Sequence, residues 1–185
     1  MLTPDMGNRV PDGVPWAADN ACFSNPAMYS DERYLSWLEA RRPYADRCLF
    51  ATAPDVVGDA PATLERSLPM LSRIREVGYP AALVAQDGLT PEMVPWDAID
   101  ALFIGGSTAW KLSEAAHALC VEAKQRGKWV HMGRVNSHKR FELARSFGCD
   151  SVDGTFLAFG PDTNEPKLQG WVDFAAAHPQ IWGRA

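Results

Sequence analysis

The chain has 185 residues, of which 46% are hydrophobic and 22% charged, and its formal net charge at pH 7 is −5. This composition predicts one globular domain over residues 1–185 with a core of its own, and no apolar run approaches the roughly 20 residues of a membrane span. The acidic balance argues against a surface that attracts nucleic acid all over, and we expect a cytoplasmic protein that does not contact a membrane.

Short apolar runs alternate with amphipathic segments along the chain. In the first half, the pattern predicts a strand at 14–18, a helix at 31–41, a strand at 47–52, a helix at 60–77 and a strand at 81–85. Leucine, isoleucine and valine recur at steps of three and four residues in the second helix, which indicates one buried face. Leu2-Thr3 predicts the stub of an earlier strand, and Ser30 is placed to cap the first helix.

The second half continues the same alternation. It predicts a helical turn at 90–94, a strand at 99–104, a helix at 108–125, a strand at 129–132, a basic helix ending at Phe147 and a short strand ending at Asp153. A last weak strand is predicted over Phe156–Phe159, and a terminal helix over Lys167–Ala177.

The order of these elements predicts the fold class. The strands are unbroken apolar runs, which is typical of a parallel sheet covered on both faces. We predict an α/β protein with a parallel-sheet TIM (β/α)8-type barrel, complete or incomplete. Six strands are clear, and the 185 residues fall below the usual ~200-residue size of a full barrel. An incomplete barrel or an open doubly wound sheet is therefore the alternative.

Polar residues and glycines follow the predicted strands, at the end where a parallel α/β fold brings its strand ends together. They are Asp19, Asp55, Gln86, Gly105-Gly106, Gly133-Arg134 and Asp153. Each also has a purely structural explanation, since Asp153-Gly154, for example, is a common turn dipeptide. The recurrence of such residues at five other strand ends favours a shared pocket.

The motifs of common cofactor sites are absent from the sequence. There is no P-loop, and Gly105-Gly106 lacks the third glycine and the later acid of a dinucleotide-binding turn. The four cysteines form no Cys-x-x-Cys pair, and no histidine cluster offers metal ligands. We therefore expect reduced thiols, no metal and no cofactor.

Converging carboxylates without a metal or a thiol suit chemistry at a glycosidic bond. One carboxylate attacks the anomeric carbon, and a second carries the proton of the leaving group. An acid close to other acids has a raised pKa, which suits the proton donor. A further Asp and a Gln can hydrogen-bond the edge of a purine-like base, and glycine N–H groups can bind its carbonyl.

A basic run interrupts the acidic chain. Seven Lys and Arg residues and one acid, Glu142, lie between residues 124 and 145. Such a run predicts either a phosphate-contacting face or a solvated helix face. Arg134, Lys139 and Arg140 are the candidates for contacts with nucleic-acid phosphates.

The strand-end residues resemble those of the tRNA-guanine transglycosylase (queuine tRNA-ribosyltransferase) superfamily, which includes relatives that insert 7-deazaguanines into DNA. The resemblance runs from about Val14 to Thr155. The run Gly148-Cys149-Asp150-Ser151-Val152-Asp153-Gly154 matches the family's nucleophile strand, which implies that Asp153 is the nucleophile. Asp19, in a loop of small residues after an early strand, matches the acid/base aspartate.

Further motifs match the part of the family's site that holds the base. Asp55, followed by Thr63-Leu64-Glu65-Arg66, matches the base-recognising aspartate, and Gln86 closes a Val-x-Gln-x-Gly pattern. The double-glycine turn that binds the base carbonyl falls on Gly105-Gly106. The Met-Gly pair that flanks the base falls on Met132-Gly133.

The chain also departs from the family. The zinc site of three cysteines and a histidine is absent, as is much of the sequence that grips tRNA, and Asn20-Ala21 replaces a double glycine. The resemblance implies a base-exchanging glycosyltransferase that replaces guanine with a 7-deazaguanine-type base in nucleic acid, DNA rather than tRNA. A free nucleoside or nucleotide is the alternative substrate. A hydrolase that releases the base and a non-catalytic base-binding module are the alternatives. The expected partners are nucleic acid, the purine-like base and a second copy of the chain in a homodimer.

Overall fold

The computed structural model describes residues 1–5 and 9–179. In this part of the chain the strands are β1 (Trp16–Ala18), β2 (Cys48–Thr52), β3 (Ala81–Ala85), β4 (Ala101–Ile104), β5 (Trp129–Met132) and β6 (Ser151–Val152). The α-helices are α1 (Asp31–Glu39), α2 (Ala60–Glu76), α3 (Thr108–Lys111), α4 (Glu114–Gln125), α5 (His138–Ser146) and α6 (Pro161–Ala177). Short 3₁₀ helices cover Arg42–Arg47, Pro91–Met93 and Trp96–Ala98. The predicted alternation of strand and helix is confirmed.

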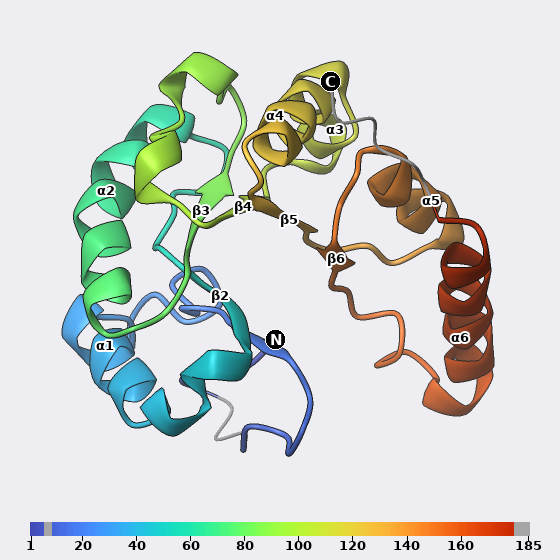
Figure 1. Cartoon of the computed structure of the whole chain (residues 1–185), viewed down its shortest axis with the longest axis horizontal. Helices are drawn as coiled ribbons and strands as arrows, with labels where there is room; N and C mark the ends of the chain where they lie inside the picture. Colours follow the sequence, from blue (N-terminus) through green and yellow to red (C-terminus); the bar gives the residue numbers. More distant parts are fainter. Residues whose placement is uncertain (6–8, 180–185) are drawn as a thin grey trace.

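The strands form one parallel sheet in the order β1-β2-β3-β4-β5-β6, so each strand pairs with its neighbours in the sequence. Leu2 extends the sheet by a parallel bridge to Ala18, at the stub predicted from the sequence. The sheet curls into a half-barrel (Figure 1). Because a doubly wound sheet reverses its strand order at a switch point, the uninterrupted order identifies an incomplete TIM-type barrel and excludes the doubly wound alternative.

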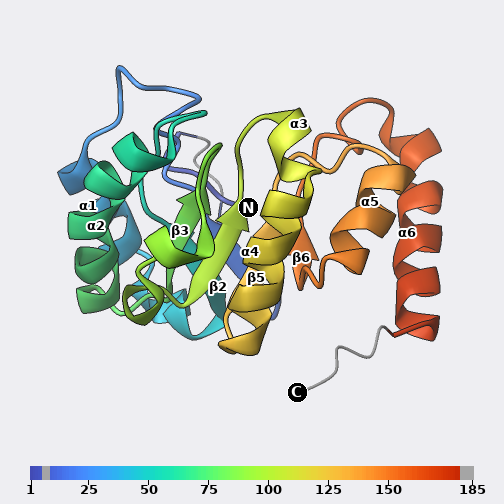
Figure 2. The same cartoon turned by 90° about the horizontal axis from the view of Figure 1, so that it is seen from above.

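Helices cover the convex face of the sheet and leave its concave face open (Figures 1 and 2). Helix α2 packs on β3, α4 packs on β4 and β5, and α1 lies against α2. The core between helices and sheet includes the fully buried Leu38, Leu71, Leu83, Leu102 and Leu119. Burial of each such side chain contributes roughly 1.5–3 kcal/mol. This apolar layer holds the strands in register and so fixes where their carboxyl ends lie.

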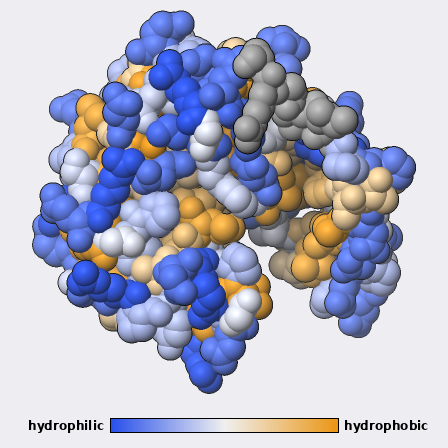
Figure 3. Space-filling model, viewed as in Figure 1, coloured by the Kyte–Doolittle hydropathy of each residue, from blue (hydrophilic) through white to orange (hydrophobic). Residues whose placement is uncertain are grey.

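Alternate residues of the strands point to the concave face. Toward the amino-terminal ends of the strands these are Ala17, Phe50, Ala82 and Ala101, which form a second, smaller apolar cluster. In Figure 3, apolar side chains lie in the hollow of this face and hydrophilic side chains surround it. Since the amino-terminal level is filled by apolar groups, polar groups of the concave face gather at the carboxyl end.

Helices α5 and α6 form a pair beyond β6 (Figures 1 and 2). The ring of Trp171 in α6 lies 5.3 Å from that of His138, 6.0 Å from Phe141 and 4.8 Å from Phe156. No residue of α6 is buried, so this helix covers α5 rather than the sheet. None of the helices in residues 1–5 and 9–179 is long and apolar enough to cross a membrane.

The strand predicted at Phe156–Phe159 is wrong. The chain turns there, and Asn164 Nδ2 donates hydrogen bonds to the carbonyls of Phe156 and Phe159 at 2.9 and 2.8 Å. The terminal helix accordingly begins at Pro161 rather than at Lys167. A proline suits the first helical position because its fixed φ is already helical.

The helix predicted at 108–125 is two helices, α3 and α4. Ser113 separates them, because its N and Oγ both donate to Trp110 O, at 2.9 and 2.6 Å, and close the last turn of α3. Ser107 begins α3 by accepting a hydrogen bond from Trp110 N at 3.2 Å. The break changes the direction of the chain before the longer helix α4 packs on β4 and β5.

Candidate functional site

The carboxyl ends of the strands surround a cavity of about 220 Å³. This is the end at which (β/α)8 enzymes bind their substrates. The structure brings together in its lining eight residues singled out from the sequence: Asp19, Asp55, Gln86, Gly105, Gly106, Gly133, Arg134 and Asp153. Three aspartates that are distant in the chain therefore share one solvent-accessible space.

Asp19 follows β1 and is held by its own loop. Its Oδ1 accepts a hydrogen bond from Ala21 N at 2.8 Å, and Ala21 adopts a left-handed conformation with φ of 61°. Burial raises the pKa of the Asp19 carboxyl above 3.8, and the negative charges of Asp55 and Asp153 raise it further against the opposing Ala21 N–H. Asp19 is therefore suited to hold a proton.

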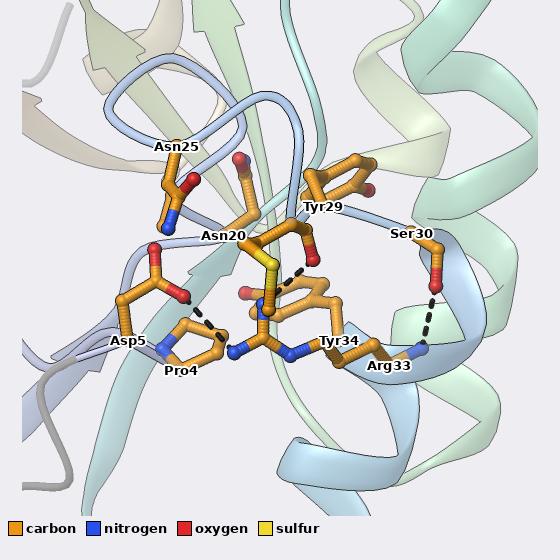
Figure 4. A pocket seen from close by; sticks show the side chains of 10 residues that line it. Pro4, Asp5, Asn20, Asn25, Tyr29, Ser30, Arg33 and Tyr34 are labelled. Atoms are coloured by element: carbon orange, nitrogen blue, oxygen red, sulfur yellow. Dashed lines mark hydrogen bonds and ion pairs between the residues drawn. The ribbon is translucent and has the colours of Figure 1, made fainter.

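The loop after β1 is fixed to its neighbours by the buried Asn20. Asn20 Nδ2 donates to Thr52 Oγ1 at 3.0 Å and to Ala53 O at 3.1 Å. Behind the loop lies a small hollow of about 10 Å³, where Arg33 pairs with Asp5 at 3.1 Å (Figure 4). A space of this size holds about one water molecule, so the loop is supported from behind and not left free to move there.

Gln86 ties the segments after β2, β3 and β4 together. Its Nε2 donates to Asp55 Oδ2 at 2.5 Å, and its Oε1 accepts from the N–H groups of Gly58 and Gly106 at 2.9 and 3.0 Å. The thiol of Cys22 donates to Asp55 Oδ1 at 3.4 Å, and burial raises the pKa of Cys22 to about 12, so this thiol keeps its proton. Burial also raises the pKa of Asp55 above 3.8 in spite of these hydrogen bonds.

Glycine is required at two positions after β4, because neighbouring atoms leave no room there for a Cβ. A Cβ on Gly105 would lie 2.9 Å from Val84 Cγ1, and a Cβ on Gly106 would lie 2.6 Å from the Trp110 ring. Gly106 also has a φ of 65°, which disfavours residues with a side chain. The turn therefore lies flat against the end of β3 and presents its backbone to the cavity.

Asp153 follows β6 and faces the same cavity from the other side. Its Oδ1 accepts a hydrogen bond from Arg134 N at 2.6 Å, and its Oδ2 lies 3.6 Å from His131 Nε2. Burial acts to raise its pKa, but the contacts with His131 and the Arg134 N–H outweigh burial and hold the pKa below 3.8. Asp153 therefore ionises at a lower pH than Asp19.

Gly133 and Lys111 support the turn after β5 that carries Arg134. A Cβ on Gly133 would lie 2.7 Å from the Phe103 ring, and Lys111 Nζ donates to Gly133 O at 2.6 Å. Burial and the charges of Arg134 and Arg140 lower the pKa of Lys111 to about 8. The buried ammonium fixes the turn from which Arg134 N reaches the carboxylate.

The structure leaves fewer residues of the basic run without an acidic partner than the sequence count indicates. Three of its members pair with acids: Lys124 with Asp150 at 2.6 Å, Arg126 with Glu122 at 2.7 Å and Arg145 with Glu142 at 3.0 Å. Arg134, Lys139 and Arg140 have no acidic partner within 4.0 Å in residues 1–5 and 9–179. Two of the paired acids lie outside residues 124–145, which is why the sequence count overestimated the basic surface.

Among the phosphate-contact candidates, only Arg134 lines the cavity, where its Nη2 donates to Gly106 O. Arg140 donates to Arg134 O at 3.4 Å, and Lys139 is exposed on α5. The structure does not bring the Met132 side chain to the cavity, because it is fully buried in the core on the other face of β5. Alternation along the strand points the residues before and after it inward instead.

Sequence reasoning missed several residues that line the cavity, among them Phe23, Thr52 and Phe103. Thr52 and Phe103 are at inward positions of β2 and β4, which the two-residue period of a strand could have identified. Phe23 comes four residues after Asp19 with no pattern around it. Its ring is 72% exposed, so the rim of the cavity offers a flat apolar surface.

The arrangement suits acid–base and nucleophilic chemistry by carboxyl groups. The pKa of Asp19 is raised and that of Asp153 is lowered, and a pair of titratable groups displaced in opposite directions is typical of active sites. Within the described residues, no three His, Cys, Asp or Glu side chains lie close enough to share a metal ion.

No family model matches the chain, and no curated protein matches it. Among solved structures, two of tryptophan synthase from M. tuberculosis superpose with TM-scores of 0.52 and 0.50 at 17% and 14% identity, over 87% and 91% of this chain. The PaMucR phosphodiesterase in complex with c-di-GMP has a TM-score of 0.46 at 15% identity, over 77% of this chain.

The chain spans 59% of the length of the first of these chains, 80% of the second and 66% of the phosphodiesterase. At these identities the likeness to tryptophan synthase shows the fold alone, one that this chain shares with an enzyme. The chemistry has to be argued from the cavity.

Proposed function

We propose that the protein is a base-exchanging glycosyltransferase that replaces guanine with a 7-deazaguanine-type base in a nucleic acid, with DNA preferred to tRNA. The observation that carries this proposal is the presence of Asp19 and Asp153 in one cavity, with pKa values displaced in opposite directions. Glycosyl transfer through a covalent intermediate uses such a pair, one carboxylate as nucleophile and one carboxyl as acid.

The two aspartates divide the chemistry between them. A carboxylate oxygen of Asp153 bonds to C1′ of the nucleotide as the C1′–N9 bond breaks, and the electron pair of that bond goes to the departing guanine, which takes the proton of Asp19. In the second half, the incoming base gives its N9 proton to Asp19, and its N9 displaces Asp153 from C1′. Both aspartates return to their starting states, and no other reactant is needed.

Asp55 and Gln86 are the proposed base-recognising residues. The carboxylate of Asp55 can accept two N–H groups from the edge of a guanine-type base, and the bond from Gln86 holds it in place. Phe23 at the rim can stack on a flat ring. The cavity of about 220 Å³ is below the roughly 300–1,000 Å³ of sites for larger ligands, which suits one base with its sugar and phosphate at the mouth.

A nucleotide within a duplex would have to be flipped out to reach this cavity. Arg134, Lys139 and Arg140 lack acidic partners within 4.0 Å among the described residues and are the proposed phosphate contacts. All four cysteines are free thiols, which suits a protein of the cytoplasm.

The test is incorporation of labelled guanine or a labelled 7-deazaguanine into duplex DNA, single-stranded DNA and tRNA. A denaturing gel detects the covalent adduct between protein and nucleic acid. We expect faster labelling of DNA than of tRNA, and a loss of about 10³-fold or more in Asp153→Asn. Asp46→Asn removes an exposed acid next to the amino-terminal end of β2, remote from the cavity, and should match the wild type.

Other outcomes identify the alternatives. Release of free guanine without incorporation of any base would replace exchange by hydrolysis. Base binding with neither incorporation nor release, in every polymer, would identify a non-catalytic binding module and end the proposal.

A further inference from the structure

His131 is buried inside the half-barrel beside Asp153. It faces inward from β5 with 3% of its surface exposed, and its ring lies 5.1 Å from the Phe50 ring and 4.6 Å from the Phe103 ring. The parallel register pairs His131 with Ser151 of β6. Ser151 and Asp153 point to the same face because they are two residues apart. Strand pairing therefore sets this histidine next to the carboxylate.

Two hydrogen bonds to Ser151 indicate which nitrogen of His131 carries a proton. Trp129 Nε1, which can only donate, bonds to Ser151 Oγ at 2.9 Å, and His131 Nδ1 lies 2.8 Å from the same oxygen. A serine oxygen can accept two hydrogen bonds while its hydroxyl donates one. We assign the hydroxyl proton of Ser151 to the bond with Nδ1, which lies 2.8 Å away, and the Trp129 N–H to one of the two lone pairs. The proton of the neutral imidazole is then on Nε2, the nitrogen that faces Asp153.

His131 Nε2 has no hydrogen-bond partner in residues 1–5 and 9–179, and it lies 3.6 Å from Asp153 Oδ2. A buried N–H left without a partner is destabilising, and catalytic hydrogen bonds are often long before substrate binds. The other oxygen of Asp153 already accepts the Arg134 N–H at 2.6 Å. Nε2 is thus a second donor aimed at the same carboxylate.

We propose that His131 is a positioning residue for Asp153, an inference that rests on the proposed function. The Nε2–H of His131 and the N–H of Arg134 each hold one oxygen of Asp153 and so set the direction of the lone pair that attacks C1′. When the C1′–O bond breaks in the second half of the reaction, the negative charge returns to Asp153. The Nε2–H stabilises that returning charge, so His131 speeds release of the sugar from Asp153 more than its capture.

Other groups also act on Asp153 and have to stay constant in the test. They are the N–H of Arg134 and the charges of Lys111, Asp19 and the amino terminus. The substitutions chosen below leave all of them in place.

The test compares His131→Leu, which fills the space between the two phenylalanine rings without a donor, with His131→Gln, whose amide keeps an N–H. In the exchange assay, we expect His131→Leu to lower kcat by about 10- to 100-fold, with KM changed less than about threefold, and the covalent adduct to accumulate. His131→Gln should recover most of kcat. Ser151→Ala, which frees Nδ1, should fall between them, and His117→Leu in α4 should match the wild type.

A pH profile gives a readout that a merely structural role would not change. The acid limb of kcat/KM reports ionisation of the nucleophile. Loss of the His131 donor is expected to move this limb up by about one pH unit, and His131→Gln should move it less.

Wild-type kcat and a wild-type acid limb in His131→Leu would overturn the inference and leave the proposed function standing. Equal losses in the Leu and Gln variants without accumulation of adduct would overturn it too. If the wild type turns over no polymer, the proposed function fails separately, and a 13C NMR titration of the Asp153 carboxyl decides the inference. Its midpoint should rise by about one pH unit in His131→Leu, and an unchanged midpoint refutes the contact.

Discussion

The two walls of the cavity place their carboxylates in opposite surroundings. We call Asp19, Asp55 and Gln86 the β1–β3 wall, and Gly133, Arg134 and Asp153 the β5–β6 wall. On the β1–β3 wall, burial raises the pKa of both carboxyls. On the β5–β6 wall, burial acts on the carboxyl in the same direction, but the pKa ends below its ordinary value.

The groups behind each carboxylate explain this difference. The β1–β3 wall is supported by neutral donors, the Cys22 thiol and the Gln86 amide. The β5–β6 wall is supported by His131 and by the buried ammonium of Lys111. At Asp55 the hydrogen bonds and the charge of Arg66 do not offset desolvation. At Asp153 the contact with His131 and the N–H of Arg134 do. The carboxyls of the two walls therefore have pKa values displaced in opposite directions, the difference on which the proposed glycosyl transfer depends.

The largest change is expected when Asp19, the proposed proton carrier, loses its carboxyl group. Asp19→Asn keeps an oxygen for the Ala21 N–H but cannot give a proton to the departing base. We expect exchange to fall by about 10²- to 10⁴-fold, the usual contribution of a general acid. The measurement is the rate of label incorporation at pH 7, with Asp46→Asn as the matched control.

A substrate in which a nitro-substituted phenol replaces the base on the sugar tests the acid role of Asp19 alone, because this leaving group departs without a proton. Cleavage of that substrate should be nearly unaffected in Asp19→Asn and abolished in Asp153→Asn. Equal losses on both substrates in Asp19→Asn would show that Asp19 does not act as the acid.

The next largest effect is expected at Gln86, which joins the loops after β2, β3 and β4. Gln86→Ala removes one bond to Asp55 and two to backbone N–H groups, all of them buried or partly buried. We expect the free energy of unfolding to fall by about 2–3 kcal/mol and base affinity to fall by about tenfold or more. Urea unfolding and calorimetry with free guanine measure the two, and Gln125→Ala on the exposed end of α4 is the control. Unchanged affinity would separate Gln86 from base recognition.

Much of the fold could be predicted because parallel strands are buried apolar runs. The bounds of β3 and β5 agree with the prediction, and Ser30 caps α1 as expected. The choice between half-barrel and doubly wound sheet could not be made from the sequence, since both have the same alternation of elements. Only the spatial order of the strands distinguishes them, and that order depends on pairing between distant segments.

The candidate site was predictable only where it depends on strand ends. Asp19, Asp55 and Asp153 meet because parallel strands bring their carboxyl ends to one side, whatever their register. The contact between His131 and Ser151 depends on which residues stand opposite each other, and a slip of one residue would turn both away. The start of α6 was missed because Asn164, from inside that helix, binds carbonyls of the preceding turn.

Removal of the carboxyl should change the free energy of unfolding in opposite directions on the two walls. A carboxyl with a raised folded pKa stabilises the fold only at low pH and loses that contribution as pH rises through the folded pKa, whereas one with a lowered pKa contributes above its unfolded value. At pH 7 we therefore expect Asp19→Asn to raise the free energy of unfolding by about 1 kcal/mol and Asp153→Asn to lower it by a similar amount.

Urea unfolding between pH 7 and pH 3 checks this pair, with Asp46→Asn as the reference. The gain in Asp19→Asn should vanish as pH falls to the ordinary Asp value of 3.8. The loss in Asp153→Asn should shrink only below that value, because its folded pKa is the lower one. Shifts of the same sign at pH 7 would contradict the contrast between the walls.

The smallest expected effect concerns backbone strain, which is present next to Asp19 on one side of the cavity and at Arg134 on the other. Ala21 and Arg134 have φ of 61° and 59°, a conformation that costs a residue with a Cβ about 1–2 kcal/mol. Ala21→Gly should raise the free energy of unfolding by about 0.5 kcal/mol, because relief of strain exceeds the entropic cost of glycine. Arg134→Gly should give no such gain, since it also loses the guanidinium bond to Gly106 O. Ala118→Gly, at an exposed position inside α4, should lose about 1 kcal/mol, and a comparable loss in Ala21→Gly would show that the loop after β1 is not strained.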